Sequence, residues 1–289
     1  MKSFDFFEAP SVEIALDSLD VDDLQIRPQG GGTALMLMMK SGVYQPSKLV
    51  SLRGIKELRD IRLSQTGELI IGSMTSLSEI EHSELVRSHA PVISDTMKRL
   101  ANVRVRNIAR LGGALAHGDP HMDLPPLLSA LGATVITISK NGRRSIEVID
   151  LYKGYYETAL KADELIESVC IPNLNNSRCV YLKCTTRSAE DWPALGVALK
   201  LKIINNHFID VHIVFGSIGE VPLEMKQVQD LLEGKHASND TLDAACELAY
   251  SLVEPSGDAL GSAEYKKELV KVYLKRALVQ AINHEGAVK

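Results

Sequence analysis

The stretch Gly30-Gly31-Gly32-Thr33-Ala34-Leu35 decides the fold, because it joins a strand-like segment at residues 24–27 to an apolar, helix-prone one at residues 33–39. Glycine has no Cβ, so its backbone can turn tightly and approach a ligand closely. Consecutive backbone amides at such a turn form a concave positive site that suits phosphate, and the Thr33 hydroxyl can donate to phosphate or cap the helix. A simple tight turn without a ligand is the open alternative.

Two better-known nucleotide motifs do not fit this turn. Leu35 occupies the position of the last glycine of a dinucleotide-binding fingerprint. The turn also lacks the Gly-Lys-Ser/Thr ending of a Walker A loop.

Outward from the turn, the pattern predicts an α+β protein. The first 58 residues read as β-α-β-α-β, with strands at 3–7, 24–27 and 48–52. A second unit follows, whose expected elements are strands at 60–63, 69–71, 134–139, 145–149 and 165–171, and helices after Ser76, at 91–100 and at 125–131. Asn141-Gly142 predicts a type I′ hairpin turn. Beyond a polar segment at 173–177, we expect three strands and then three helices, at 180–185, 194–204, 208–217, 223–232, 241–252 and 263–282.

Composition excludes several classes of function. The 289 residues carry a formal net charge of −5, with 45% hydrophobic and 24% charged residues. These values are ordinary for a soluble globular protein and give no electrostatic reason to bind nucleic acid. No apolar run is long enough to span a membrane and no export signal is visible, so a cytoplasmic location is expected. The four cysteines form no C-x-x-C pair, and their spacing fits no iron–sulfur cluster on this chain.

A second glycine-rich segment, residues 110–123, holds three glycines, two histidines and two carboxylates before a helix. One interpretation is a metal site made by His117, Asp119, His121 and Asp123. Gly118 and Pro120 interrupt the regular strand that would point these side chains to one face. A second phosphate-binding loop, with Asp123 fixing a hydroxyl group, is therefore the preferred interpretation. We see no nucleophile–base pair or acid–base dyad that would make a catalytic site.

The two segments together resemble the flavin-binding medium subunit of the molybdenum hydroxylases, the family of carbon monoxide dehydrogenase and xanthine dehydrogenase. The first glycine stretch is similar to the family motif Ala/Gly-Gly-Gly-x-x-Leu. Residues 104–107 with 111–114 are similar to Gln-Ile-Arg-Asn followed by Thr-Ile-Gly-Gly-Asn. Similar matches occur at 71–75, 118–120, 123–125, 262–266 and 275–278, so the resemblance covers nearly the whole chain.

This resemblance implies a two-lobed FAD-binding domain of the vanillyl-alcohol-oxidase-like type and a small C-terminal α+β domain with a three-stranded sheet and helices. The lobes would be residues 1–58 and 59–174, and the C-terminal domain residues 178–285. The FAD diphosphate would lie on the two glycine segments, and we expect their turns to converge. The cofactor-binding residues implied are Gly30, Gly31, Gly32, Thr33, Ala34, Leu35, Arg110, Leu111, Gly112, Gly113, Ala114, Asp123, Ile166, Lys183 and Trp192.

Two departures from the family pattern concern side chains. Arg110 stands where the family has threonine before its Gly-Gly pair, and it is either a phosphate ligand or a solvated loop charge. Ala114 stands where asparagine is common, which removes a side-chain hydrogen bond. Trp192 is either a neighbour of the flavin ring or an ordinary core residue.

The function implied is electron transfer. In the family this subunit takes electrons from the iron–sulfur clusters of a small subunit, which a large subunit with a molybdenum–pterin site reduces, and FAD passes them to an external acceptor. A dimer of heterotrimers is the expected assembly. The alternatives are a stand-alone FAD oxidoreductase of the same fold and a His/Asp metal-binding module.

Overall fold

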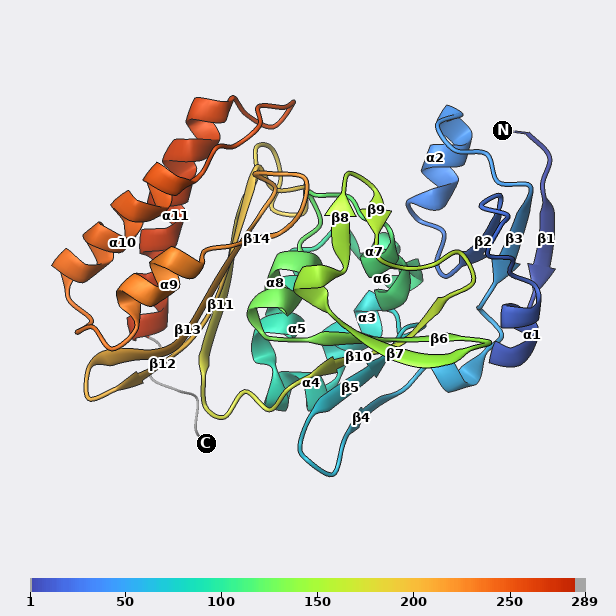
Figure 1. Ribbon diagram of the computed structural model, residues 1–289, viewed down its shortest axis with the longest axis horizontal. Coiled ribbons are helices and arrows are strands. Elements are labelled where there is room, and N and C mark those ends of the chain that lie inside the picture. The colour runs from blue at the N-terminus through green and yellow to red at the C-terminus, as the bar shows by residue number, and fades with distance from the viewer. Residues whose placement is uncertain (1, 284–289) are drawn as a thin grey trace. The chain divides into compact units, whose positions relative to one another are not determined.

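Residues 2–283, which the computed structural model describes, form two units, each built on its own sheets (Figure 1). The first unit takes in the residues up to 118 together with 133–151 and 157–173. The second takes in residues 119–132, 152–156 and everything described from 174 onward. Each unit mixes helices and strands, as the sequence predicts.

A three-stranded parallel sheet in the order β1-β3-β2 begins the first unit. Its strands and connecting helices are β1 (Asp5–Glu8), α1 (Val12–Asp17), β2 (Ile26–Gln29), α2 (Leu35–Ser41) and β3 (Lys48–Ser51). Ser11 caps α1 by accepting a hydrogen bond from the Ile14 amide. Buried Ala15 and Leu16 of α1 pack with Val50 of β3. The order of the elements along the chain confirms the predicted β-α-β-α-β pattern.

Pro28 lies within β2, so the strand runs beyond its predicted end at residue 27. The strand is at the edge of the sheet, with β3 on one side only. Proline is tolerated there because the missing N–H would face away from the neighbouring strand.

An antiparallel sheet in the order β4-β5-β10-β6-β7 forms the rest of the first unit. Its strands are β4 (Ile61–Leu63), β5 (Leu69–Gly72), β6 (Thr134–Ser139), β7 (Gly142–Glu147) and β10 (Leu165–Ile171). The accompanying helices are η1 (Lys56–Leu58), α3 (Leu77–His82), α4 (Glu84–His89), α5 (Pro91–Met97), α6 (Val103–Ile108), α7 (Leu111–Ala116) and η2 (Val148–Asp150). Two short strands, β8 (Tyr152–Gly154) and β9 (Glu157–Thr158), precede β10.

The hairpin between β6 and β7 turns one residue earlier than predicted. Ser139 pairs with Gly142, which centres the turn on Lys140 and Asn141. Gly142 has φ of 113°, whereas neither central residue is among the positive-φ residues of the described chain. The expected type I′ turn at Asn141-Gly142 is therefore wrong, since that turn requires positive φ at both central residues.

The second unit contains an antiparallel sheet in the order β11-β12-β13-β14. Its strands are β11 (Arg178–Cys184), β12 (Leu195–Ile204), β13 (His207–Gly216) and β14 (Leu223–Glu224), and its helices are α8 (Leu124–Ala130), α9 (Lys226–Leu232), α10 (Asn239–Leu252) and α11 (Ala263–Asn283). The expected sheet had three strands. The two residues of β14 fall where the sequence predicts the start of a helix, because a strand that short leaves no periodic pattern.

Helices cover both faces of this sheet, with α11 on one face and α8 on the other (Figure 1). Leu195, Val197 and Leu199 of β12 belong to the core under α9, α10 and α11. The other face packs against α8 at Gly216 of β13. A Cβ on Gly216 would lie 2.7 Å from Cγ of Pro126, so only glycine allows α8 to pack this closely.

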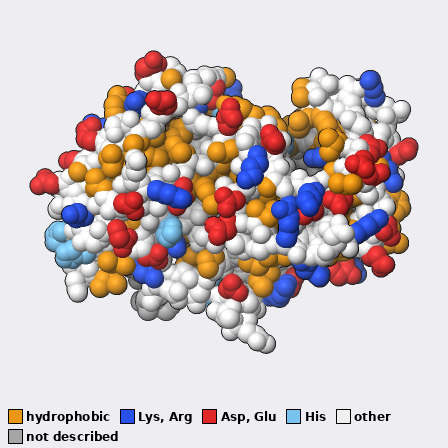
Figure 2. Space-filling model, viewed as in Figure 1, with side chains coloured by type: hydrophobic (Ala, Val, Ile, Leu, Met, Phe, Trp, Pro, Cys, Tyr) orange, Lys and Arg blue, Asp and Glu red, His pale blue; other side chains and the backbone are white. Residues whose placement is uncertain are grey.

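Among residues 2–283, no helix combines the length and the apolar character needed to cross a bilayer. On the face seen in Figure 2, acidic and basic side chains are interspersed with hydrophobic ones rather than gathered by sign.

Ser76 offers a test of the local folding argument. Its hydroxyl accepts from the Glu79 amide, and the Glu79 carboxylate accepts from the Ser76 amide at 2.7 Å, which together form a capping box at the start of α3, the helix expected after Ser76. Ser76→Ala should lower the free energy of unfolding by about 1 kcal/mol. Chemical denaturation measures this. Ser78→Ala, two residues further along the same helix, is the control and should change stability by less than about 0.5 kcal/mol. Equal losses in both variants would contradict the capping argument.

Candidate cofactor-binding site

Three backbone segments of the first unit meet beside α7. The turn after β2 reaches the end of α6, since a Cβ on Gly31 would lie 2.1 Å from the Ile108 carbonyl oxygen. A Cβ on Gly30 would lie 3.3 Å from Cβ of Arg110. The expected convergence of the two glycine segments is therefore what the structure shows.

The segment after β5 is the third member of this group. The Leu111 amide donates to the Thr75 carbonyl at 3.1 Å, and the Gly112 amide donates to the Ser73 carbonyl at 2.8 Å. A Cβ on Gly112 would lie 2.7 Å from Cβ of Ser73, so this contact also requires glycine. The sequence shows the Ile-Gly-x-x-Thr pattern here, but Ser73 and Thr75 were not expected at the site.

The second glycine segment is not a loop throughout. Residues 111–116 form the short helix α7, with Gly112 and Gly113 in its first turn. Glycines disfavour a helix in isolation. Here the bonds to Ser73 and Thr75 fix the start of the helix from outside, a tertiary effect that local propensity does not reveal.

These segments present unused hydrogen-bonding groups. Within residues 2–283, the amides from Gly30 to Ala34 donate no hydrogen bond to another group of the chain. The hydroxyls of Ser73 and Thr75 are buried and likewise have no partner in the described chain. A Cβ on Gly113 would meet nothing within 4 Å. Buried or turn-bound polar groups are normally paired, so this region fits a ligand rich in hydrogen-bond acceptors, as a diphosphate is.

Three arginines lie near these segments. Arg110 approaches Glu79 at 3.6 Å, and Arg59 donates to the Arg53 carbonyl at 2.8 Å. Burial lowers the pKa of Arg110 most, the charges of Arg59 and Arg53 lower it further, and Glu79 opposes them. Three guanidinium groups thus act on one carboxylate, that of Glu79, so positive charge is in excess at this place.

In the second unit, Asp123 and Lys183 come together. The Asp123 carboxylate accepts from Lys183 Nζ at 3.2 Å and from the Tyr181 hydroxyl at 2.8 Å, and both charged side chains are buried. Tyr181 and Lys183 alternate along β11 with Val180 and Leu182, which face the helical core. Tyr181 is a member of this group that the sequence did not indicate.

Ile166 of the first unit and Trp192 of the second are the remaining predicted residues. Ile166 is 6% exposed within β10, next to an irregularity in its pairing with β6. Trp192 is 54% exposed and stacks on His121, with ring centroids 6.2 Å apart. Trp192 is therefore not a core residue, and its place beside the flavin ring stays a prediction.

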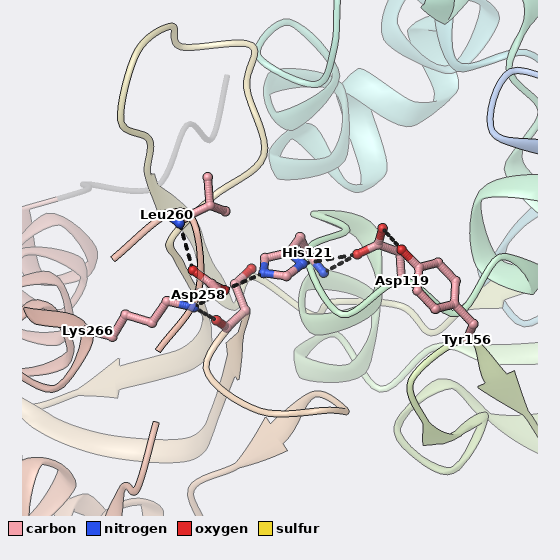
Figure 3. Close-up of polar contacts among 7 residues, drawn as sticks. Asp119, His121, Tyr156, Asp258, Leu260 and Lys266 are labelled. Carbon is pink, nitrogen blue, oxygen red and sulfur yellow. Dashed lines mark hydrogen bonds and ion pairs between the residues drawn. The ribbon is translucent and has the colours of Figure 1, made fainter. Parts of the chain in front are cut away.

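His121 is held between two carboxylates (Figure 3). Its Nδ1 lies 3.2 Å from Asp119 Oδ1, and its Nε2 lies 2.9 Å from Asp258 Oδ2. Tyr156 donates to the other oxygen of Asp119 at 2.9 Å. Burial alone would raise the pKa of Asp119, but the hydrogen bonds from His121 and Tyr156 outweigh it and lower that pKa.

The metal interpretation of this segment finds no support in the geometry. Among residues 2–283, no three His, Cys, Asp or Glu side chains are placed to hold a metal ion. Both ring nitrogens of His121 are engaged with carboxylates, which leaves neither lone pair directed at a metal.

Comparisons with known families account for both parts of the chain. A family described as "FAD binding domain in molybdopterin dehydrogenase" matches residues 2–174. A second, described as "CO dehydrogenase flavoprotein C-terminal domain", matches residues 180–281.

Individual relatives match over almost their full length. The glyceraldehyde dehydrogenase medium chain of Sulfolobus acidocaldarius is 31% identical over 95% of this chain and 96% of its own. The nicotine 6-hydroxylase medium subunit of Paenarthrobacter nicotinovorans is 34% identical over 94% of each chain. A solved structure of Cu,Mo-CO dehydrogenase superposes with a TM-score of 0.92 at 30% identity, over 97% of this chain and 98% of the solved one. The chain therefore belongs to the family of FAD-binding medium subunits of the molybdenum hydroxylases, and it is an oxidoreductase component.

Proposed function

We propose that this chain is the FAD-binding subunit of a multi-subunit molybdenum hydroxylase, in which electrons from the iron–sulfur clusters of a partner subunit pass through FAD to an external acceptor. The observation that carries the proposal is the meeting of three backbone segments with unused donors, within a domain of the FAD-binding family. Bound FAD would supply the reversible electron chemistry, and the chain would supply binding, orientation and charge.

The residues that would hold the FAD diphosphate are those of the converging segments. Amides from Gly30 to Ala34 would donate to phosphate oxygens, Leu35 would follow them into α2, and residues 110–114 would close the other side. Gly31 and Gly112 would act by permitting the close backbone approach, and Gly113 by leaving room for the cofactor. The hydroxyls of Ser73 and Thr75 join the site as further polar groups.

The arginine group would supply charge to the same phosphates. Arg110 is only partly exposed, and Arg53 and Arg59 lie near enough to affect its pKa. A diphosphate carries at least two negative charges, which would offset this excess of positive charge. We accordingly take Arg110 to be a phosphate ligand rather than a solvated loop charge.

The other assignments concern the flavin ring and the architecture. Ile166, Lys183 and Trp192 are proposed as ring neighbours on the strength of the family resemblance, and Asp123 is proposed to fix a hydroxyl group of the cofactor. The sheets of the first unit are proposed as the two lobes of a vanillyl-alcohol-oxidase-like domain, residues 1–58 and 59–174. A C-terminal domain of residues 178–285 would follow, of which 284 and 285 lie outside the described residues.

The proposed partners are a small iron–sulfur subunit and a large molybdenum–pterin subunit, assembled as a dimer of heterotrimers. The relatives support this, because their names describe medium chains or subunits, as for carbon monoxide dehydrogenase of Afipia carboxidovorans. The proposal is tested by purifying the chain with its neighbours and assaying flavin, iron, sulfide and molybdenum. FAD released from this chain by denaturation, with metals only on other chains, is the expected result. Active flavoprotein without any partner would favour the stand-alone oxidoreductase.

A side chain at position 113 should exclude FAD without disturbing the fold. Its Cβ would meet no protein atom, and valine costs less than glycine within a helix. We expect FAD affinity to fall slightly for Gly113→Ala and by at least roughly tenfold for Gly113→Val, with unfolding midpoints unchanged. Flavin absorbance at equilibrium measures the affinity. Full FAD occupancy in Gly113→Val would show that α7 does not face the cofactor.

The charge argument predicts a dependence on salt. The double variant Arg53→Gln/Arg59→Gln should bind FAD roughly tenfold more weakly at low ionic strength, and the difference should shrink at high salt. Riboflavin, which has no phosphate, should bind both proteins alike. The matched control is Arg62→Gln/Arg99→Gln, which removes two exposed charges from the same unit. Equal weakening by both double variants, or weaker riboflavin binding, would contradict a phosphate contact.

A further inference from the structure

His121 joins three segments of the second unit that are distant in sequence. Its imidazole lies between Asp119 on its own segment and Asp258, which precedes α11 (Figure 3). The face of the ring stacks on Trp192, with an angle of 15° between the two ring planes. One side chain therefore contacts two anions through its edges and an indole through its face.

The two carboxylates require a doubly protonated ring. An ionised carboxylate can only accept hydrogen bonds, and a neutral imidazole has a single N–H. Both ring nitrogens of His121 face carboxylate oxygens, at 3.2 and 2.9 Å. Only the imidazolium, with two N–H groups, can donate to both.

Asp258 is firmly ionised. It accepts from Lys266 Nζ at 2.6 Å and from the Leu260 amide at 2.8 Å, in addition to His121. Burial alone would raise the pKa of Asp258, but these hydrogen bonds outweigh it and lower the pKa to about 2. For His121, the hydrogen bond to Asp119 raises the pKa most, burial opposes it, and Asp258 adds to the increase.

We propose that His121 is a positioning residue: as an imidazolium fixed between Asp119 and Asp258, it holds the indole of Trp192 in one orientation, and loss of its proton releases that indole. The positive charge of the His121 imidazolium strengthens its stack on Trp192, because a cation over the face of an indole is attracted by the ring electrons. Trp192 is 54% exposed, and His121 is the ring that stacks on it within the described residues. The consequence for catalysis rests on the proposed function, in which Trp192 adjoins the flavin ring.

Within the described part of the second unit, several charged and titratable groups surround His121 and Trp192. They are Asp119 and Asp258 in contact, Lys266 behind Asp258, Tyr156 behind Asp119, and Asp191 with Arg187 on the segment of Trp192. Asp119 and Asp258, with pKa values below their ordinary range, stay ionised above pH 5, and Tyr156, with its pKa raised to about 12, stays neutral. His121, whose pKa is raised above its ordinary value, is thus the group in direct contact with Trp192 whose charge changes in this titration.

The sign of the pH dependence follows from the raised pKa. The bridge contributes stability in full below the ordinary histidine pKa of about 6.5, and that stability is lost as pH rises through the higher pKa of folded His121. The Trp192 stack should follow the same curve.

Trp192 is the single tryptophan of the chain, so indole fluorescence reports on this stack alone. The experiment titrates the fluorescence of the purified full-length chain from about pH 5 to pH 9, with excitation at the red edge of indole absorption. An imidazolium quenches a stacked indole more than neutral imidazole does. We expect emission to increase in one step with a midpoint above 6.5, and His121→Gln to abolish the step.

Two further variants complete the design. Asp258→Asn keeps His121 but removes one carboxylate, so the pH midpoint of the fluorescence step should fall. This variant tests the proposal even if His121→Gln folds poorly. His212→Gln is the matched control, because His212 also pairs with a carboxylate, Asp210 at 3.1 Å, and should leave the step unchanged.

The proposal is overturned if His121→Gln keeps the wild-type step, if Asp258→Asn leaves the midpoint in place, or if the wild-type midpoint lies at or below 6.5. These readouts need no flavin. A chain that shows the step but binds no FAD would refute the proposed function while leaving the His121–Trp192 pair intact.

Discussion

The backbone turn at Gly31 and the carbonyl oxygen of Ile108 approach too closely for any side chain to fit between them. A Cβ would lie 2.1 Å from that oxygen, far inside van der Waals contact. This approach brings the turn after β2 to the start of α7. The second close contact, between Gly112 and Ser73, adds the segment that follows β5. Three segments from different parts of the sequence are thereby held together, and their unused amides and hydroxyls are the groups that we propose bind the FAD diphosphate.

Regular elements of this fold could be predicted where the local pattern and the tertiary environment agree. The strand at residues 165–171 and the capping box at Ser76 are examples, because alternation and capping chemistry are visible within a few residues. Prediction from the local pattern fails where contacts with a neighbouring element determine the conformation. Pro28 stays in β2 because that strand is an edge, and Leu111–Ala116 is helical because Ser73 and Thr75 accept its first amides. Neither fact is encoded nearby in the sequence.

The residues of the candidate site likewise fall into those that the sequence indicates and those that only the structure reveals. Its glycines are evident in the sequence, since clustered glycines mark close backbone approach. The groups that complete it are not evident, because Ser73 and Thr75 are ordinary residues until their hydroxyls are found buried without partners. Arg53 and Arg59 become candidates for the site only because the structure places their charges near Arg110. His121 was weighed as a metal ligand, yet its partner Asp258 lies 137 residues away in the sequence and gives it a different role.

The position of α8 has a consequence for synthesis of the chain on the ribosome. Pro126 packs against Gly216, and Asp123 neutralises Lys183, so this early helix belongs with strands that are made much later. At typical elongation rates the 90 residues between Pro126 and Gly216 take on the order of 5–20 s to translate. Throughout that interval the contact of Pro126 with Gly216 and the ion pair of Asp123 with Lys183 cannot form. The second unit therefore cannot complete its packing until β13 is translated, whereas every residue of the first unit has been made by residue 173.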